Sequence, residues 1–467
     1  MDILAIPFFA TDQVWGTTLQ ICIVAIGLLV GNLLRTNVPF LQKSLIPSAL
    51  IGGVVLLIFK SIPDMKEIIN RESMEVITYH ALGLGFVALA LKNNKVESKS
   101  SAMKVLETGT LTANTYIIQG IAGLLVTIPL FYFGRKFYYA GGLLLPMGYG
   151  QGPGQALNFG TIYTNTAAEQ GITFPGVDFG LSIAATGFIV GSVIGVVYLN
   201  ILKKKGYIKL SEIREKQKHK LSDYESENEI PDTESVDKMS IQICLVLFTY
   251  FLVYVFNNTL QNLPLGSFGE KTLMPLMWGF NFLLGTLFGL LIKWVINICK
   301  KKKLMKREYI NNYLLNRISG FFFDVMIVAA TAAINFHEFK GFALPFILVI
   351  VLGTVFTFLY IRKVSSHLYP TYKYEGFLSM FGMLTGTASN GMILLREIDP
   401  KFETPAANNL VLQSLPAVAL GFPVLLLITL APQGFTQTLI TFGLLVIAFV
   451  IFNLFLFRTK IFKKKRK

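Results

Sequence analysis

The chain has 467 residues, of which 53% are hydrophobic and only 15% are charged, and its mean hydropathy is +0.57. This composition excludes an ordinary soluble protein and is typical of helices that lie in lipid. The formal net charge of +15 does not indicate a nucleic-acid partner, because the basic residues form short clusters between apolar runs, at 203–205, 300–303 and 463–467. Such clusters set the orientation of membrane helices.

Apolar runs long enough to cross the bilayer recur along the chain. The first five spans are predicted at 16–34, 45–59, 77–91, 111–133 and 181–202. A hydrophilic linker at 203–238, rich in Lys, Glu, Ser and Asp, follows them and cannot bury a core of its own. Five more spans are predicted at 239–256, 273–299, 319–334, 342–361 and 406–430, and one further span at 435–457.

Two segments inside the apolar regions do not have the sequence of a continuous helix. They share a Gly-x3-Gly-x3-Asn spacing at one offset (382 − 150 = 232): Gly150, Gly154 and Asn158 in the first, Gly382, Gly386 and Asn390 in the second. Glycine and amide side chains at membrane depth fit backbone that is buried in protein or faces a water-filled cavity. Two such segments in corresponding halves point to the central site of a secondary transporter.

The distribution of Lys and Arg decides how these two segments are placed. If both are re-entrant, at about 140–160 and 376–396, most basic loops fall on one face, and loop 161–177, which has neither Lys nor Arg, falls on the other. Each half then has an odd number of spans, so the second half is inverted and the two segments enter from opposite faces. This arrangement places the N-terminus outside, and the linker and the C-terminus in the cytoplasm.

We therefore predict an all-α integral membrane protein with two inverted-topology repeats. The first repeat is 1–202 and the second is 239–430, and each has five transmembrane helices and one re-entrant glycine-rich loop. The extra helix and a basic tail fill 431–467. A second internal match, of the segment 43–47 with 271–275 at an offset of 228 (271 − 43), supports the duplication.

Three motifs in the chain resemble those of the glutamate:sodium symporter family. They are Ile46-Pro-Ser-Ala-Leu-Ile-Gly-Gly53, Gly150-Gln-Gly-Pro-Gly154-Gln155 and Gly382-Met-Leu-Thr-Gly386-Thr-Ala-Ser-Asn390. The helix order and the central linker agree as well, so the resemblance covers nearly the whole chain. It implies Na⁺-coupled uptake of glutamate or a related small carboxylate or amino acid at the cell membrane. It also implies a homodimer and elevator-like movement of a transport unit.

The two broken segments supply most of the candidate substrate and ion ligands. Backbone N–H groups freed at glycines would hold a carboxylate, while carbonyl, amide and hydroxyl oxygens suit Na⁺. The alternatives are helix packing for the glycines and local hydrogen bonds for the polar side chains. The candidates are Gly150, Gln151, Gly152, Gly154, Gln155 and Asn158 in the first segment, and Gly382, Thr385, Gly386, Thr387, Ser389 and Asn390 in the second.

Two further candidates lie within predicted spans. Asp324 places a carboxylate in an apolar run, which predicts a Na⁺ ligand, a proton carrier or a partner for an ammonium group, with a structural hydrogen bond as the alternative. Gln119 follows Asn114 and Thr115 in the same span, so it either lines the path or bonds a neighbouring helix. The sequence does not separate Na⁺ ligands from substrate ligands.

Three functions remain after this reading. Na⁺-coupled symport by alternating access comes first, and an H⁺-coupled carrier of another organic anion or amino acid, working through Asp324, is the alternative. A third hypothesis is an ion channel, since Gly148-Tyr149-Gly150 is similar to a potassium filter, but it lacks the preceding Thr-Val and four equivalent loops. The sequence has no paired carboxylates near His or Ser and no metal-ligand spacing, so we expect no enzyme activity and no cofactor.

Overall fold

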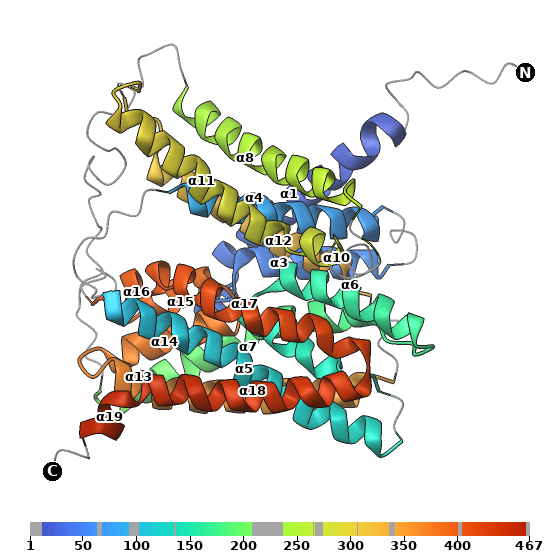
Figure 1. Ribbon diagram of the computed structural model, residues 1–467, viewed down its shortest axis with the longest axis vertical. Coiled ribbons are helices and arrows are strands. Elements are labelled where there is room, and N and C mark those ends of the chain that lie inside the picture. Colours follow the sequence, from blue (N-terminus) through green and yellow to red (C-terminus); the bar gives the residue numbers. More distant parts are fainter. Residues whose placement is uncertain are drawn as a thin grey trace, which may run out of the picture. The chain divides into compact units, whose positions relative to one another are not determined.

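The structure is a computed structural model. It describes the chain except for residues 1–11, 63–67, 93–101, 135–136, 208–236, 265, 267–273, 306, 336–340, 400–403 and 464–467. The described part is helical and contains no β-strand (Figure 1). Ten of its helices are long and apolar enough to cross a membrane. The chain is therefore a multi-pass membrane protein, while most of the predicted linker at 203–238 lies outside the described residues.

The helices follow the predicted order. The first half contains α1 (Asp12–Asn37), α2 (Pro39–Ser44), α3 (Ser48–Lys60), α4 (Arg71–Leu91), α5 (Ala102–Tyr132), the short turns η3 (Gly141–Leu143) and η4 (Pro146–Gly150), α6 (Pro153–Glu169) and α7 (Gly176–Lys204). The second half contains α8 (Lys238–Gln261), α10 (Met274–Gly279), α11 (Asn281–Lys301), α12 (Asn312–Ala333), α13 (Ala343–Leu368), α14 (Lys373–Leu384), α15 (Ala388–Arg396), α16 (Ala406–Leu412) and α17 (Ser414–Leu430). The turn η8 (Ala431–Gln433), α18 (Phe435–Leu456) and α19 (Arg458–Lys463) complete the chain.

Several predicted boundaries differ from the observed ones. The span at 406–430 is divided into α16 and α17, because Pro416 has no N–H to bond the carbonyl of Leu412. The span at 273–299 is likewise divided, at Phe280. Helix α6 continues for 17 residues from Pro153, well past the predicted end of the first broken segment at 160.

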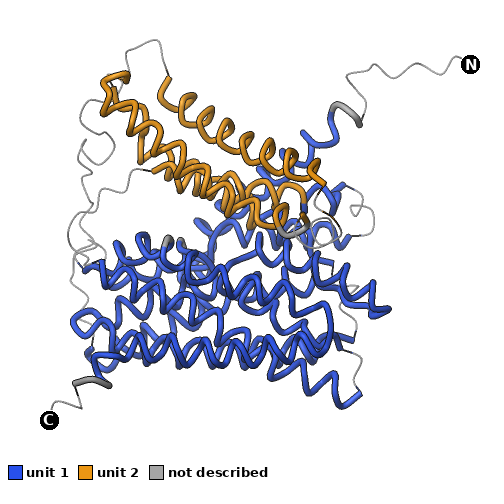
Figure 2. The backbone as a smooth tube through the Cα atoms, viewed as in Figure 1, with its two compact units in different colours: residues 1–75, 96–211, 328–467 blue, residues 76–95, 212–327 orange. Residues whose placement is uncertain are grey.

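The chain forms two compact units (Figure 2). Unit 1 comprises residues 1–75, 96–211 and 328–467, and unit 2 comprises 76–95 and 212–327. Unit 2 is a bundle of α4, α8, α11 and most of α12, in which Gly289 of α11 packs against Ala90 of α4. Both broken segments belong to unit 1.

The core of unit 1 contains an aromatic cluster that holds α14 against α7 and α13. Phe377 is 1% exposed, and its ring lies 4.7 Å from that of Tyr198 on α7 and 5.2 Å from that of Phe358 on α13. The ring of Phe381, one turn further along α14, stacks on Phe377 at 5.5 Å. These contacts fix the helix that leads into the second broken segment.

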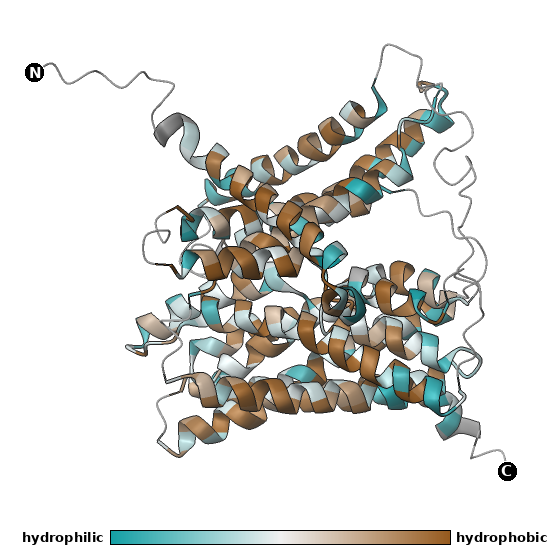
Figure 3. Cartoon of the chain, turned by 180° about the vertical axis from the view of Figure 1, so that it is seen from behind, coloured by the Kyte–Doolittle hydropathy of each residue, from teal (hydrophilic) through white to brown (hydrophobic). Residues whose placement is uncertain are grey.

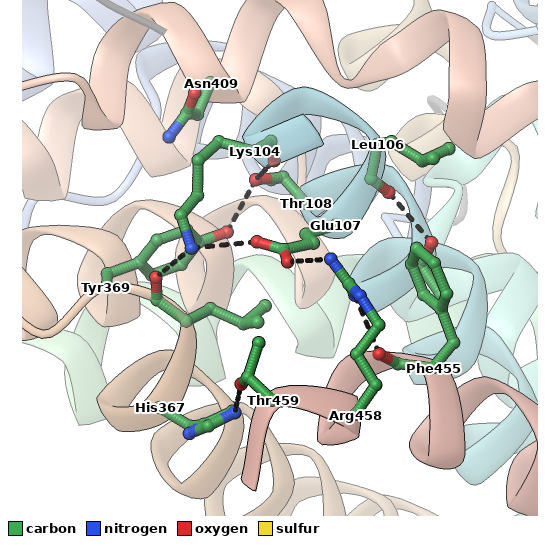
Figure 4. Close-up of polar contacts among 12 residues, drawn as sticks. Lys104, Leu106, Glu107, Thr108, His367, Tyr369, Asn409, Phe455, Arg458 and Thr459 are labelled. Atoms are coloured by element: carbon green, nitrogen blue, oxygen red, sulfur yellow. Dashed lines mark hydrogen bonds and ion pairs between the residues drawn. The ribbon is translucent and has the colours of Figure 1, made fainter. Parts of the chain in front are cut away.

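The extra helix α18 packs along α5, and much of its remaining surface is exposed and apolar. Hydrophobic residues predominate along many of the described helices (Figure 3). An ion-pair cluster joins α19, the helix after α18, to α5 (Figure 4). The buried carboxylate of Glu107 accepts from Arg458 at 2.6 Å and from Lys104 at 2.8 Å. The ammonium of Lys104 also donates to the carbonyl of Leu368 on α13, so the cluster links α5, α13 and the C-terminal helices.

Candidate functional site

The first broken segment ends in a helix N-terminus. The π-helical turn η4 closes at Gly150, and Gly152 has φ +89°, a conformation that glycine adopts without strain. Pro153 then begins α6, where its missing N–H costs no helical bond. The first bond into α6 runs from the N–H of Ala156 to the carbonyl of Gly152, so the N–H groups of Gly154 and Gln155 come before the intrahelical ladder.

The second broken segment also ends in a helix N-terminus, although its residues differ from those of the first. Helix α14 ends at Leu384, and α15 begins at Ala388 after an extended Thr387 whose side chain makes no capping bond. Gly382 lets the two helices pack closely, because an added Cβ would lie 2.9 Å from the carbonyl oxygen of Asn390. The segment is therefore a tight helical hairpin with a second uncapped helix N-terminus at its turn.

The two breaks meet inside unit 1. A Cβ added to Gly152 would lie 3.6 Å from the carbonyl oxygen of Gly386 and 3.8 Å from the Cγ2 atom of Thr387. Helices α6 and α15 therefore begin next to each other. Each N-terminus carries a partial positive charge and unbonded N–H groups, so the pair favours an anionic group between them.

Buried polar atoms without a partner gather around this point. Among the described residues, neither amide atom of Gln155 and neither amide atom of Asn390 has a hydrogen-bond partner, although these side chains are 1% and 3% exposed. The hydroxyl of Thr387 and the Oε1 atom of Gln119 are also unpaired. Buried polar groups are normally bonded. Four side chains with unpaired polar atoms, on three helices or their caps, therefore form a set of donors and acceptors suited to a polar ligand.

The side chain of Gln119 on α5 bonds both α13 and the end of α14. Its Nε2 atom donates to the carbonyl of Leu384 at 2.8 Å, at the end of α14, and to the hydroxyl of Thr357 on α13 at 3.2 Å. Its Oε1 atom lies 2.9 Å from the position of a Cβ at Gly150. The amide therefore ties α5, α13 and α14 together and leaves one oxygen facing the first break.

The other candidates differ in their burial and in their contacts. Gly150 packs against the ring of Tyr116, and the hydroxyl of Thr385 donates to the carbonyl of Phe381. Gln151 and Thr387 are half-buried, and Ala388, which follows Thr387, is exposed. Asn158 is buried one turn after Gln155, Gly154 is buried beside them in the first turn of α6, and the side chain of Ser389 lies outside what the structure describes.

Asp324 is placed elsewhere. It lies on α12 in unit 2, where its side chain is exposed. Its predicted role in binding a cation or a proton stays a prediction.

A glycine series on α7 was not among the candidates. Gly187, Gly191 and Gly195 recur every four residues and so share one helix face. An added Cβ at Gly187 would lie 2.4 Å from the carbonyl oxygen of Thr385, and one at Gly195 would lie 2.6 Å from the side chain of Leu394 on α15. The regular spacing is visible in the sequence, and the structure shows that these glycines pack against the second broken segment.

Comparison with known proteins gives the family of the chain. Residues 15–371 match the family described as Sodium/glutamate symporter. The chain belongs to this family. The match confirms the resemblance and implies Na⁺-coupled transport across a membrane. It includes the first broken segment and ends before α14, so the second segment is assigned from the geometry alone. A search of curated proteins found no match.

Proposed function

We propose that the protein is a secondary active transporter that carries glutamate, or a related small carboxylate or amino acid, together with Na⁺. The observation that carries this proposal is the meeting of two uncapped helix N-termini beside unpaired buried amides. A carboxylate needs several N–H donors and a positive local field, and both are available at the starts of α6 and α15. The family name, Sodium/glutamate symporter, refers to a carboxylate and a cation, and both fit these groups.

Distinct groups in the site suit the substrate and the coupling ion. The N–H groups of Gly154 and Gln155, with those of the first turn of α15, would bind the substrate carboxylate. The amide oxygens of Gln119 and Asn390 and the carbonyl of Gly386 suit Na⁺, which prefers uncharged oxygen ligands. A site built from both breaks is complete only when both segments are ordered, so binding of the ion favours binding of the substrate.

Movement of Na⁺ and movement of the substrate are coupled if only the fully loaded and the empty transporter can turn the site from one face of the membrane to the other. We propose that the two halves are inverted repeats, that the segments enter from opposite faces, and that a transport unit moves in an elevator-like manner within a homodimer. The repeated spacing of Gly154 and Asn158 against Gly386 and Asn390 supports the duplication. A ligand shifts such an equilibrium only by its differential affinity for the two states, so the site must be tighter when both ligands are present.

Uptake of labelled L-glutamate into proteoliposomes tests the proposal, with an inward Na⁺ gradient, with equal Na⁺ on both sides, or with an inward pH gradient. We expect saturable accumulation only with the Na⁺ gradient. Accumulation driven by the pH gradient alone would replace Na⁺ by H⁺, and loss of that uptake in Asp324→Asn would then identify the proton carrier. Absence of glutamate uptake, with Na⁺-dependent uptake of another carboxylate, would replace the substrate.

A further inference from the structure

A second polar site lies at the other end of α14. Unit 1 has an open cavity of about 350 Å³ between the ends of α7, α13 and α14. Its polar side is lined by Arg362, Lys363 and Lys373, together with the hydroxyl of Ser366. Its inner side is lined by Leu359 and by the buried ring of Phe377.

The three cations lack the usual surface partners. No carboxylate of the described residues lines the cavity or forms an ion pair with any of them. Two of them are instead held by aromatic rings. The guanidinium of Arg362 lies 5.6 Å from the ring centroid of Tyr198, and the ammonium of Lys373 lies 4.8 Å from that of Tyr374. Such contacts orient a cation. The guanidinium of Arg362 also bonds the hydroxyl of Tyr198, and with five N–H donors it keeps others available.

The approach to this cavity along α13 is apolar. Val351, Val355 and Leu359 recur every four residues on one face of the helix and are 55%, 44% and 56% exposed. The same face continues into Arg362 and Lys363, where the apolar sequence of α13 gives way to charged residues. One continuous strip therefore presents a hydrocarbon-like surface followed by a cluster of positive charge.

We propose that this cavity binds the phosphate of an anionic phospholipid, with one acyl chain lying along Val351, Val355 and Leu359. A phosphate diester has a single negative charge and two free oxygens, which Arg362, Lys363 and Lys373 can bind together. Basic pockets between membrane helices bind acidic headgroups in this way. A free phosphate ion would use the cations and make no use of the apolar strip, so the strip favours the lipid.

The position of the cavity connects lipid binding to the candidate site. The ligand contacts α13 and the first two turns of α14, and the last carbonyl of α14, that of Leu384, accepts from Gln119. A lipid bound there holds α14 against α13 through Phe377 and Phe358. This proposal concerns binding and does not depend on the identity of the transported substrate.

Native mass spectrometry of the full-length protein in detergent tests the proposal, with added phosphatidylglycerol, phosphatidylcholine or inorganic phosphate. We expect wild type to retain one phosphatidylglycerol molecule in preference to phosphatidylcholine. The variant R362Q/K363Q/K373Q should bind it about 100-fold more weakly, since each cation near an anionic lipid contributes about fivefold. The control K301Q/K302Q/K303Q removes the same charge at the end of α11 and should bind like wild type.

Three outcomes would overturn the proposal. They are equal retention of phosphatidylglycerol by wild type and R362Q/K363Q/K373Q, equal loss in the control variant, and displacement of the lipid by millimolar phosphate, which would make a free anion the ligand. All three cations are exposed, so the triple variant leaves the core unchanged. If its yield is nevertheless low, K373Q alone should weaken binding about fivefold, and an unchanged affinity there would count equally against the site.

Discussion

Replacing Asn390 by Ala should weaken substrate or Na⁺ binding at least tenfold without destabilising the protein. Both polar atoms of the Asn390 amide are buried and unpaired among the described residues. An unpaired buried polar atom costs about 1–3 kcal/mol, and removing it recovers that cost. The cavity left by three heavy atoms costs about 1 kcal/mol at about 24 cal/mol per Å³. The two effects nearly cancel, so the thermal stability of Asn390→Ala should be equal to that of wild type or slightly higher.

Gln413 provides a matched control close to the same hairpin. It is 3% exposed like Asn390, but its Oε1 atom accepts from the hydroxyl of Thr112 at 2.8 Å, and its Nε2 atom donates to the carbonyl of Leu410 and the sulfur of Met383. Gln413→Ala removes these bonds at about 1 kcal/mol each and should destabilise the protein by about 2–4 kcal/mol. The two variants therefore separate a ligand-binding amide from a structural one.

The assay combines thermal unfolding in detergent with initial uptake rates in proteoliposomes, normalised to correctly reconstituted protein. Asn390→Ala should lose at least tenfold in substrate or Na⁺ affinity, which is about 1.4 kcal/mol for one lost ligand bond. A variant that unfolds as early as Gln413→Ala and transports normally would refute the reasoning, because the amide would then be structural.

Three further predictions concern packing, charge and topology. Gly187→Ala places a methyl group against the Thr385 carbonyl, so it should cost about 1–3 kcal/mol in stability and weaken substrate binding, as measured by thermal unfolding with and without substrate. Glu107→Gln leaves two flanking cations without their counter-charge and should lower the free energy of unfolding by about 2 kcal/mol, an effect that high salt should reduce. Single cysteines at Glu169 and Glu397, in a cysteine-free background, should react with a membrane-impermeant reagent from outside and from inside respectively; labelling of both from one face would exclude the inverted repeat.

The sequence predicted that both segments are broken because the break itself requires particular residues. Gly152 adopts a positive φ and Pro153 begins a helix, and both properties are local. The second break was harder to locate, since Gly382 stays within α14 and the chain turns at 385–387 instead. In a helix the same glycine serves close packing, so its type alone does not fix where the helix ends.

The sequence alone did not predict which residues far apart in the chain are in contact. The repeated spacing predicted that the two segments share a role, but their meeting at Gly152 and Gly386 depends on how α5, α7 and α13 pack around them. Glu107 illustrates the same limit, because its partner Arg458 is 351 residues away and belongs to the C-terminal helix α19. Local patterns assign such a residue to a helix end and leave its partner open.

The extra helix α18 is joined to α13 and α5 by a chain of hydrogen bonds. The hydroxyl of Tyr360 on α13 accepts from the Asn114 amide at 2.5 Å and donates to the Oδ1 atom of Asn453 on α18 at 3.2 Å. Asn453→Leu would leave the half-buried hydroxyl without its acceptor and should destabilise the protein by about 1 kcal/mol. Ile447→Leu, on the exposed side of α18, should be neutral in the same thermal unfolding measurement. Equal stabilities of the two variants would mean that α18 is held by apolar packing and the Arg458 ion pair alone; a specific loss in Asn453→Leu would make the extra helix part of the framework that positions α5 and α13.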